Sequence, residues 1–479
     1  MSITINRSFG VIFCLTFAFA SGCESKVFRS ETRLFPDGSV ERAISQPLEN
    51  VPEAARNKDA GWQELFQTRL VNPIETRDVP IRELAKALRG DRREKAVVDP
   101  KLTNFVAWGK FANFGSLPDS FEVKVLDDYR TGRIVRSLDR VELGFVTEWR
   151  WKENLVDTFN LTEHRIAREE IIRDSVAIAI ASARRAWGSS YDLHELENWL
   201  NTEARAAFHE SCDLVLEMGF KRQLKQYRKY QIPFFTILQR HGLDLFESPD
   251  KPLTDEKQLQ SRVEEFLVQT VDRLVKDKEG KPLMRSLVSD MLKTWNSDSS
   301  TKKQTRLQNA CEHILSAQYG GQEKFERLSL ERTARLVGCY LPSFMTTECF
   351  KTSEEFEYQL EMPGVIMKTT GQLFSNNQVR WRFPLHDAFP LGYSMEATAV
   401  VVNEEAVRKY LPAGTLQSQD QVNRYLDLVR KDQGLALVLI QFANHGDPSG
   451  YDLWVKNCLE SGSVESIRLA NDIKKLSGR

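Results

Sequence analysis

The chain lacks the short motifs that mark the commonest enzyme classes. It contains no phosphate-binding G-x-x-x-x-G-K-S/T loop, no dinucleotide-binding G-x-G-x-x-G, no H-E-x-x-H, no G-x-S-x-G and no EF-hand loop. These absences remove the commonest NTPases, dinucleotide enzymes, zinc proteases and α/β-hydrolases. Neither a cofactor nor a catalytic residue is therefore predicted.

An excess of charge of one sign is missing as well. The chain has 66 Lys and Arg residues against 67 Asp and Glu residues. Nucleic-acid binders need a basic surface to neutralise phosphates, so this balance argues against nucleic acid as the partner. A content of 41% hydrophobic and 28% charged residues predicts folded cores, with room for about three domains.

Paired cysteine motifs are also absent. Without a C-x-x-C pair, a structural zinc site is not expected. Beyond the N-terminal segment the chain has five cysteines, namely Cys212, Cys311, Cys339, Cys349 and Cys458. An odd number leaves at least one thiol unpaired. Cys339 and Cys349 are close enough in sequence to form a disulfide, and ordinary buried thiols are the alternative.

Long hydrophobic runs occur only at the start of the chain. The segment Phe9–Ala20 is apolar apart from Gly10 and Thr16, and Arg7 precedes it. It has about 12 residues, whereas a membrane-spanning helix needs roughly 20. Residues 1–22 are therefore predicted to be a secretory signal peptide. The longest later run, 435–440, is far too short to span a membrane.

Small residues lead directly to a cysteine after this run. The string Ala20-Ser21-Gly22-Cys23 resembles the lipobox of bacterial lipoproteins, although Ala20 stands where Leu is usual. The resemblance covers residues 1–23 and implies a diacylglycerol on the sulfur of Cys23, cleavage after Gly22 and acylation of the new amino group. More than one acyl chain gives stable membrane anchoring. Glu24, rather than Asp, favours the outer membrane of a two-membrane cell, on its periplasmic side.

Two other readings of the N-terminus remain. Ala18-Phe19-Ala20 is also an A-x-A site, and cleavage before Ser21 would release a soluble secreted protein. A cytosolic protein with an apolar start by chance is the third reading.

Residues 363–381 are loosely similar to β domains of uncharacterised bacterial lipoproteins, which carry no assigned catalytic residues.

The alternation of side chains predicts strands on both sides of a long helical block. Val27–Leu34 and Val40–Ile44 form a hairpin around Asp37-Gly38. Residues 141–151 form one strand with Val141, Leu143, Phe145, Thr147, Trp149 and Trp151 on its apolar face; Arg140, Glu142, Glu148, Arg150 and Lys152 lie on the solvent-facing side. Strands are also expected over 356–360, 365–370, 379–383 and 394–403, and mixed helix and loop over 49–99.

Helical spacing dominates residues 161–345. Helices are predicted over 166–187, from Asp192 to Met218 with Gly219 as the terminating residue, and over 220–240, 255–278, 282–295, 303–318 and 323–338. We therefore expect an α+β fold, with an antiparallel β-sheet domain, a large inserted helical domain and a helical C-terminal tail. Three domains in series are the alternative.

The expected parts of the chain follow from these patterns. They are a signal peptide (1–22), a lipid-anchored hairpin and linker (23–60), the first part of the β domain (61–160), the helical domain (161–345), the second part of the β domain (346–403) and the helical C-terminal region (404–479).

Few residues suggest chemistry. His194 and His209 would share one helix face about 22 Å apart, too far to share a metal. Cys311 and His313 lie on one helix without facing each other, and Ser300–Lys303 has the S-x-x-K spacing without its companion motifs. The His386-Asp387 and His445–Asp447 pairs are expected to be surface features. Trp149, Trp151 and Trp381 could stack a sugar or a lipid but fit core packing better.

One surface feature predicts a contact. Five basic residues would form a single stripe on the predicted 220–240 helix: Lys221, Arg222, Lys225, Arg228 and Lys229. Such a stripe can contact an anionic surface, or be solvated and balanced by nearby carboxylates. The sequence therefore predicts a lipid-anchored cell-envelope protein that binds or scaffolds an unidentified partner. The alternative is an envelope hydrolase whose site is assembled from distant loops.

Overall fold

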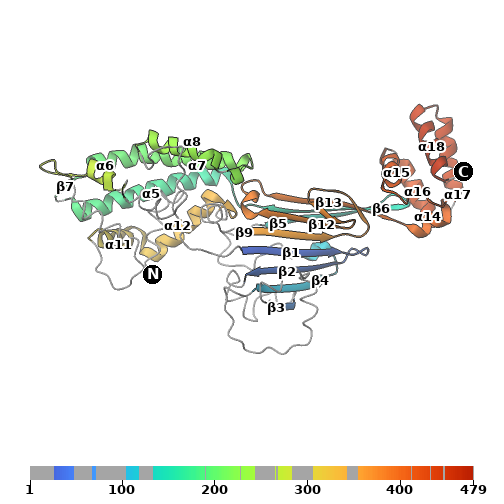
Figure 1. The fold of residues 1–479 in the computed structure, drawn as a ribbon, viewed down its shortest axis with the longest axis horizontal. Helices are drawn as coiled ribbons and strands as arrows, with labels where there is room; N and C mark the ends of the chain where they lie inside the picture. The colour runs from blue at the N-terminus through green and yellow to red at the C-terminus, as the bar shows by residue number, and fades with distance from the viewer. Residues whose placement is uncertain are drawn as a thin grey trace.

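The computed structural model shows an elongated molecule in three parts (Figure 1). A helical domain lies at one end, a β-sandwich in the middle and a group of C-terminal helices at the other end. The structure describes residues 26–47, 67–71, 104–117, 133–188, 190–226, 228–242, 265, 268–282, 306–341, 354–411, 413–431, 433–445 and 448–477.

The larger sheet of the sandwich has seven strands in the order β11-β12-β9-β1-β2-β4-β3. They are β1 (Lys26–Leu34), β2 (Val40–Pro47), β3 (Gln67–Val71), β4 (Asn104–Phe111), β9 (Glu354–Glu361), β11 (Gln372–Ser375) and β12 (Gln378–Pro384). The predicted β1–β2 hairpin is confirmed, with Gly38 at φ +85° in its turn. It lies inside this sheet and is not a separate segment.

Two expectations about this sheet need correction. β1 and β9 run parallel, so the sheet is mixed. Residues 67–71, expected in a mixed helix and loop region, form strand β3, which pairs with β4 at the edge of the sheet. Local sequence patterns do not indicate the pairing of β1 with β9 or of β3 with β4, because the paired strands are far apart in the chain.

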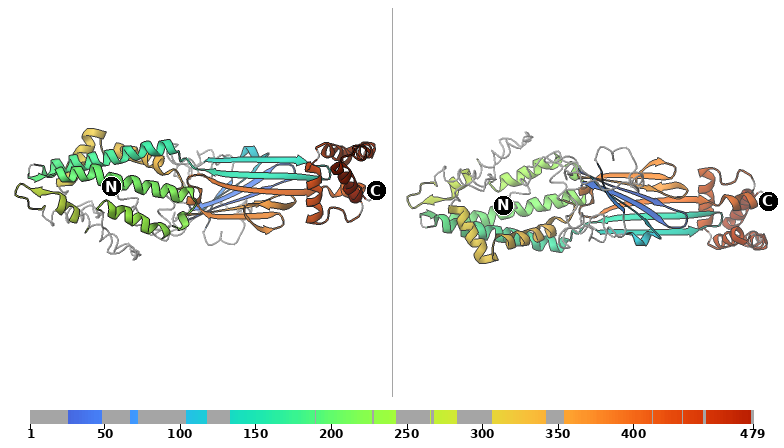
Figure 2. Two further views of the ribbon diagram at one scale, coloured as in Figure 1. Left: turned by 90° about the horizontal axis from the view of Figure 1, so that it is seen from above. Right: turned by 90° about the horizontal axis from the view of Figure 1, so that it is seen from below.

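The second sheet has four strands in the order β10-β13-β6-β5. They are β5 (Arg133–Glu142), β6 (Val146–Val156), β10 (Val365–Thr369) and β13 (Tyr393–Val402). Strands from before and after the helical domain thus pair side by side (Figure 2). The predicted α+β fold with an inserted helical domain is confirmed.

The predicted single strand over 141–151 is wrong. The chain turns back at Gly144, whose φ is +75°, and the Leu143 N–H donates to the Val146 carbonyl at 2.8 Å. The segment is the β5–β6 hairpin. Leu143 and Phe145 continue the alternation, but they leave the sandwich and pack with the C-terminal helices.

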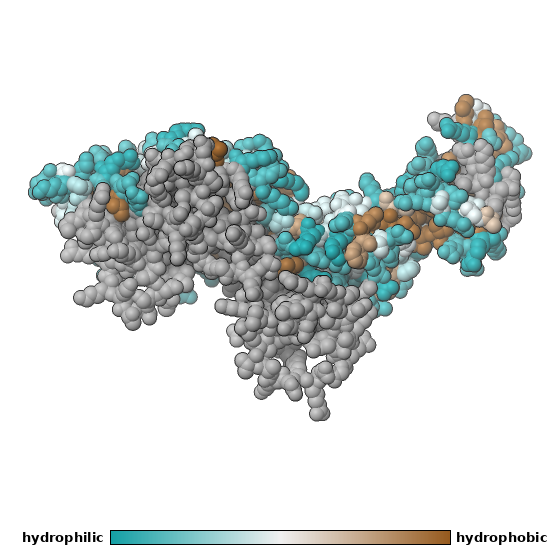
Figure 3. All heavy atoms as spheres, viewed as in Figure 1, coloured by the Kyte–Doolittle hydropathy of each residue, from teal (hydrophilic) through white to brown (hydrophobic). Residues whose placement is uncertain are grey.

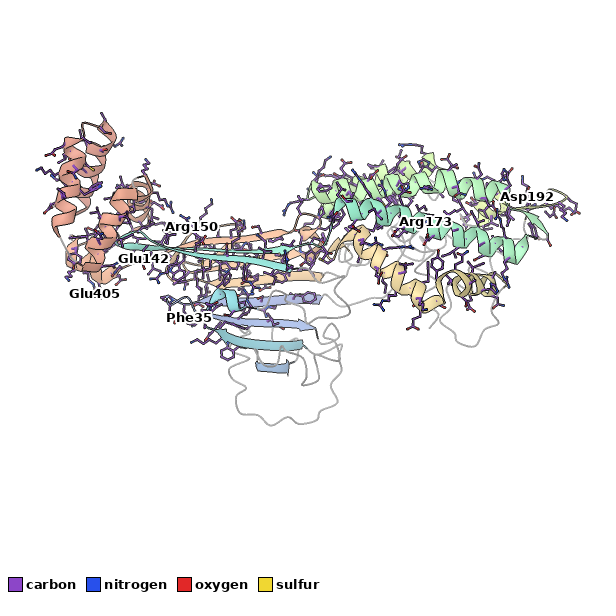
Figure 4. All side chains as sticks on the ribbon, turned by 180° about the vertical axis from the view of Figure 1, so that it is seen from behind. Phe35, Glu142, Arg150, Arg173, Asp192 and Glu405 are labelled. Atoms are coloured by element: carbon purple, nitrogen blue, oxygen red, sulfur yellow. The ribbon has the colours of Figure 1, made fainter. Side chains whose placement is uncertain are left out.

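The solvent-facing side of β6 is also only partly solvated. Glu148 is fully buried, because α15 (Gln419–Lys431) lies across this end of the sheet. Arg430 of α15 and Arg150 both pair with the Glu148 carboxylate. Arg150 itself lies on the outside of the sandwich, beside the C-terminal helices (Figure 4).

Aromatic side chains fill the space between the two sheets. Trp151 of β6 lies 5.4 Å, between ring centroids, from both Tyr358 of β9 and Trp381 of β12. Trp149 and Trp381 are buried in the same core. The core-packing interpretation of these tryptophans is confirmed.

The helical domain is built around α5, the longest helix described. Its described helical segments are α5 (Leu161–Trp187), α6 (His194–Trp199), a π-helical turn (Leu200–Ala204), α7 (Arg205–Phe220), α8 (Arg228–Arg240), α11 (Arg306–Tyr319) and α12 (Gln322–Val337). Asn160 begins α5 by accepting hydrogen bonds from two backbone N–H groups of its first turn. The apolar faces of α5, α7 and α12 form one core.

Five short helices form the C-terminal part. They are α14 (Glu404–Tyr410), α15, α16 (Gln433–His445), α17 (Pro448–Glu460) and α18 (Val464–Ser477). The Tyr425 hydroxyl of α15 donates to the Leu143 carbonyl at 2.5 Å and accepts from the Phe145 N–H at 3.1 Å. These bonds fasten the helices to the β5–β6 turn. In the described part of the chain, no helix combines the length and apolarity needed to cross a membrane.

Candidate functional site

A buried polar cluster joins the two sheets of the sandwich. Its members are Thr32, Arg42, Arg136, Glu153 and Tyr358, and we call it the polar core cluster. Arg42 Nη2 donates to Glu153 Oε1 at 2.6 Å, and Arg42 Nε donates to Thr32 Oγ1 at 2.9 Å. Arg42 also donates to the Tyr358 hydroxyl at 2.5 Å, and that hydroxyl lies 2.6 Å from Thr32 Oγ1.

The polar core cluster is sealed from solvent. Arg42 is 2% exposed, and Glu153 and Tyr358 are 0% exposed. Burial lowers the pKa of Arg42, but the Glu153 carboxylate more than offsets this and raises it, so the guanidinium stays charged. Burial raises the pKa of Tyr358, which therefore stays neutral. The ion pair links the two sheets. An external substrate does not reach it.

An open groove of about 110 Å³ crosses the outer face of the seven-stranded sheet. Side chains alternate between the two faces of each strand, and this alternation places the lining residues of the groove on the outer face. The pairing of neighbouring strands aligns most of these residues in two rows. One row runs Trp108, Ala43, Glu31, Gln359 and Arg380, and the other runs Glu41, Arg33, Glu361 and Gln378. Phe374 of β11 closes one end of this outer groove.

Charges in the outer groove are largely paired with one another. Arg33 Nε lies 3.0 Å from Glu361 Oε1, and Arg29 lies 3.8 Å from both Glu31 and Glu357. The Arg380 guanidinium lies over the Phe374 ring at 4.8 Å. The lining has no histidine, cysteine or serine. Such a surface can bind a polar ligand, and among the described residues it offers no imidazole base.

Exposed apolar side chains occur on all three parts of the molecule, and two groups of them lie at the edge of the sandwich and on the C-terminal helices (Figure 3). Val365, Leu373 and Phe374 lie on β10 and β11, at the side edge of the sandwich. Leu437, Leu453 and Val464 lie on the C-terminal helices.

The predicted basic stripe does not form. The chain leaves the helix after α7, and Arg222 adopts a φ of +53° before a 3-10 turn over Leu224–Gln226. Lys221 ends α7, and Arg228 and Lys229 begin α8. The side chain of Arg228 lies outside the described residues. The stripe assumed one continuous helix, and this break puts its members on different elements.

The basic residues are instead used where the helical domain meets the sandwich. We define this junction as the contact of residues 217–229 with residues 385–392. Lys225 Nζ lies 2.7 Å from Asp387 Oδ2, and Arg222 Nη2 donates to the Gly392 carbonyl at 3.2 Å. Lys221 pairs with Glu217, and Lys229 donates to Gln226 Oε1 at 2.7 Å. Each described member thus has a partner within the protein.

Reversing one charge of the junction should weaken it slightly. Lys225 and Asp387 form a solvent-exposed pair, so Lys225→Glu should lower the free energy of unfolding by up to about 1 kcal/mol. Lys225→Glu combined with Asp387→Lys should recover most of the loss in a double-mutant cycle with the two single variants. If Lys225→Glu leaves stability unchanged and instead abolishes binding to anionic vesicles, the residue serves a surface contact and not the junction.

His386 departs from its expected place on the surface. It lies in the 3-10 turn Leu385–Ala388 and is fully buried, 3.7 Å from Asp387 Oδ1. Burial lowers the pKa of His386 to about 4. The imidazole is therefore neutral at physiological pH, and it does not line the outer groove.

The other predicted candidates do not assemble into a site. His194 is exposed, and His209 lies 3.3 Å from Glu169 of α5. Burial raises the pKa of Cys311, which keeps this thiol protonated. Ser300–Lys303, Asp447 and the side chain of His445 lie outside the described residues.

Cys339 is a free thiol beside Asp157. Its N–H donates to Asp157 Oδ1 at 2.8 Å, and its Sγ lies 3.3 Å from the same oxygen. Burial and the adjacent carboxylate raise the pKa of Cys339, so the thiol is unreactive. Gly338 has a φ of +65° and approaches Asp157 so closely that a Cβ would lie 2.2 Å from Oδ1. Cys349, its predicted disulfide partner, lies outside the described residues.

The sequence patterns did not predict one ionisable site, which is centred on His241. His241, after α8, lies 2.7 Å through Nδ1 from Glu203 Oε2 and 3.0 Å through Nε2 from Glu210 Oε1. Both nitrogens can donate only when the ring is protonated. Burial lowers the pKa of His241, but the two carboxylates outweigh this and raise it. The partners lie more than 30 residues away in sequence, so no local pattern marks them.

This histidine should make stability depend on pH. Because its folded pKa is raised, its contribution is complete below the unfolded value of about 6.5 and is lost as pH rises through the folded pKa. The free energy of unfolding should therefore fall more steeply between about pH 6 and 8 in the wild type than in His241→Gln. Denaturant unfolding at a series of pH values measures this, and equal slopes would contradict it. Burial lowers the pKa values of His164 and His209, which changes stability with pH in the opposite direction. Both proteins contain these histidines, so their contribution cancels when the two slopes are compared.

Within the described residues, no three His, Cys, Asp or Glu side chains are arranged to hold a metal ion. The comparison with known proteins finds no matching family model, no matching curated protein and no matching solved structure.

Proposed function

We propose that the protein is a lipid-anchored cell-envelope protein with a binding or scaffolding role. Cys23, after Ala20-Ser21-Gly22, is the anchoring residue, and this string is the single observation that carries the proposal. The membrane is that of a bacterium, with the periplasmic side of the outer membrane favoured. The partner of the folded part is a further component of the envelope.

The architecture supports a scaffold more than an enzyme. The ionisable groups of the polar core cluster pair across the two sheets, and Lys225 and Arg222 fasten the helical domain to the sandwich. These groups hold the two sheets together and join the sandwich to the helical domain, and Tyr425 and Arg430 fasten the C-terminal helices. The outer groove offers a polar surface on which a ligand can lie.

A hydrolase is the weaker candidate. It would require a histidine or carboxylate of shifted pKa in an open cleft. His386 has the shifted pKa, but it is fully buried and lies outside the lining of the outer groove.

Metabolic labelling with a fatty acid tests the anchor. The wild type should incorporate label and partition with membranes, and Cys23→Ser should lose both. Cys14→Ser is the matched control, because Cys14 leaves with the signal peptide and its loss should change neither property. Equal labelling of Cys23→Ser and the wild type would overturn the proposal.

A further inference from the structure

The folded part begins almost at the anchoring residue. Only Glu24 and Ser25 separate Cys23 from Lys26, the first residue of β1. An extended chain advances at most about 3.6 Å per residue, so these three steps span no more than about 11 Å. A lipid on Cys23 must therefore hold the start of β1 close to the bilayer surface.

The start of β1 lies at the junction end of the sandwich. Lys26 pairs with Glu354, and Glu355 pairs with Pro384, the last residue of β12. The next residues, 385–388, form the turn that contacts the helical domain. At the other end of β1, Phe35 lies at the end of the sandwich nearer the C-terminal helices (Figure 4).

This junction is close to the middle of the molecule. The helical domain extends from it in one direction, and α5 alone, with 27 residues, is about 40 Å long. The sandwich extends in the other direction by the length of β6, whose 11 residues span about 36 Å, and the C-terminal helices lie beyond it. Strands β1 to β4 also lie to one side of the line that joins the two ends (Figure 1).

We infer that the lipid holds the protein near the middle of its long axis, with the junction end of the seven-stranded sheet against the bilayer. This inference rests on the proposed anchor at Cys23. The surface that meets the membrane is the one from which β1 starts, and its partner is the bilayer that carries the acyl chains. The helical domain and the C-terminal helices then stand off from the membrane on either side, where both are open to other partners.

Energy transfer to a labelled lipid headgroup tests this arrangement. A donor is placed, one site at a time, in the lipidated full chain reconstituted in vesicles. The three sites are Arg382 at the junction end of the seven-stranded sheet, Lys278 in the far part of the helical domain and Val464 in the C-terminal helices; all three are exposed. With the anchor within about 11 Å of β1 and each arm about 40 Å long, transfer at Arg382 should be at least about twofold that at either other site.

A longer tether provides the matched control. About 20 Gly and Ser residues inserted between Ser25 and Lys26 add roughly 25 Å of flexible reach, which should lower transfer at Arg382 toward the level of the other sites. Equal transfer at all three sites without the insertion, or the strongest transfer at Lys278 or Val464, would overturn the inference. Fatty-acid labelling of the same samples separates the two claims. Unlabelled protein contradicts the anchor, whereas labelled protein with the wrong order of transfer contradicts only the orientation.

Discussion

Glu153→Gln should lower the free energy of unfolding by about 3–5 kcal/mol, because it leaves a buried guanidinium without its counter-charge. Arg42 is 2% exposed and donates to Glu153 Oε1 at 2.6 Å. Arg136 Nε lies 3.6 Å from the same oxygen, so a second cation loses its carboxylate. Glutamine keeps the volume of the side chain, and the loss therefore reports charge and not a cavity. Denaturant unfolding measures it.

Two variants make the test specific. Glu396→Gln removes the same type of carboxylate from β13, the strand next to β6, but from an exposed pair with Lys152 at 2.7 Å. Its cost should stay below about 1 kcal/mol. Arg42→Met with Glu153→Leu removes both charges and should be less destabilised than Glu153→Gln alone. Similar small losses for Glu153→Gln and Glu396→Gln would contradict a sealed ion pair.

Trp151→Ala should destabilise the sandwich by about 3–5 kcal/mol, through lost burial and the cavity that remains. Trp151 is 2% exposed and contacts rings from three other segments of the chain, namely those of Phe114, Tyr358 and Trp381. Its removal therefore loosens contacts between both sheets at once. Thermal or denaturant unfolding followed by circular dichroism checks the size of the effect.

Phe374→Ala is the matched aromatic control. Phe374 is 65% exposed on the edge strand β11, so its loss, including the contact of its ring with the Arg380 guanidinium, should cost less than about 1 kcal/mol. If Trp151→Ala proves as mild as Phe374→Ala, the space between the sheets is not the close-packed core described above.

Local patterns predicted much of the fold. The β1–β2 hairpin follows from two alternating segments around Asp37-Gly38, and strands β9, β10, β12 and β13 follow from alternation between turn residues, whereas β11 was not predicted. The pairing of β6 with β13 could be inferred because strands on each flank need neighbours to bury their apolar faces. These features depend on neighbouring residues or on a general requirement of sheets.

The errors arose where tertiary contacts override local pattern. Alternation continues through residues 141–151, so the turn at Gly144 is marked by one glycine only, and Tyr425, about 280 residues away, fastens it. The helical spacing of the basic residues likewise continues past Lys221, although the chain turns there to reach Asp387 and Gly392. Sequence periodicity does not contain these contacts.

The candidate sites were harder to foresee than the fold. The polar core cluster takes its members from β1, β2, β5, β6 and β9, and only the three-dimensional packing brings them together. Glu153 continues the inward positions of Trp149 and Trp151, and a carboxylate at such a position is the one sequence signal of a buried ion pair. His241 has no comparable signal.

The mass of the N-terminal peptide of the natural mature protein tests the central proposal most directly. Lipidation predicts a peptide that begins at Cys23, carries a diacylglycerol on sulfur and is acylated on its amino group. A peptide that begins at unmodified Ser21, or that retains Met1, would contradict the anchor.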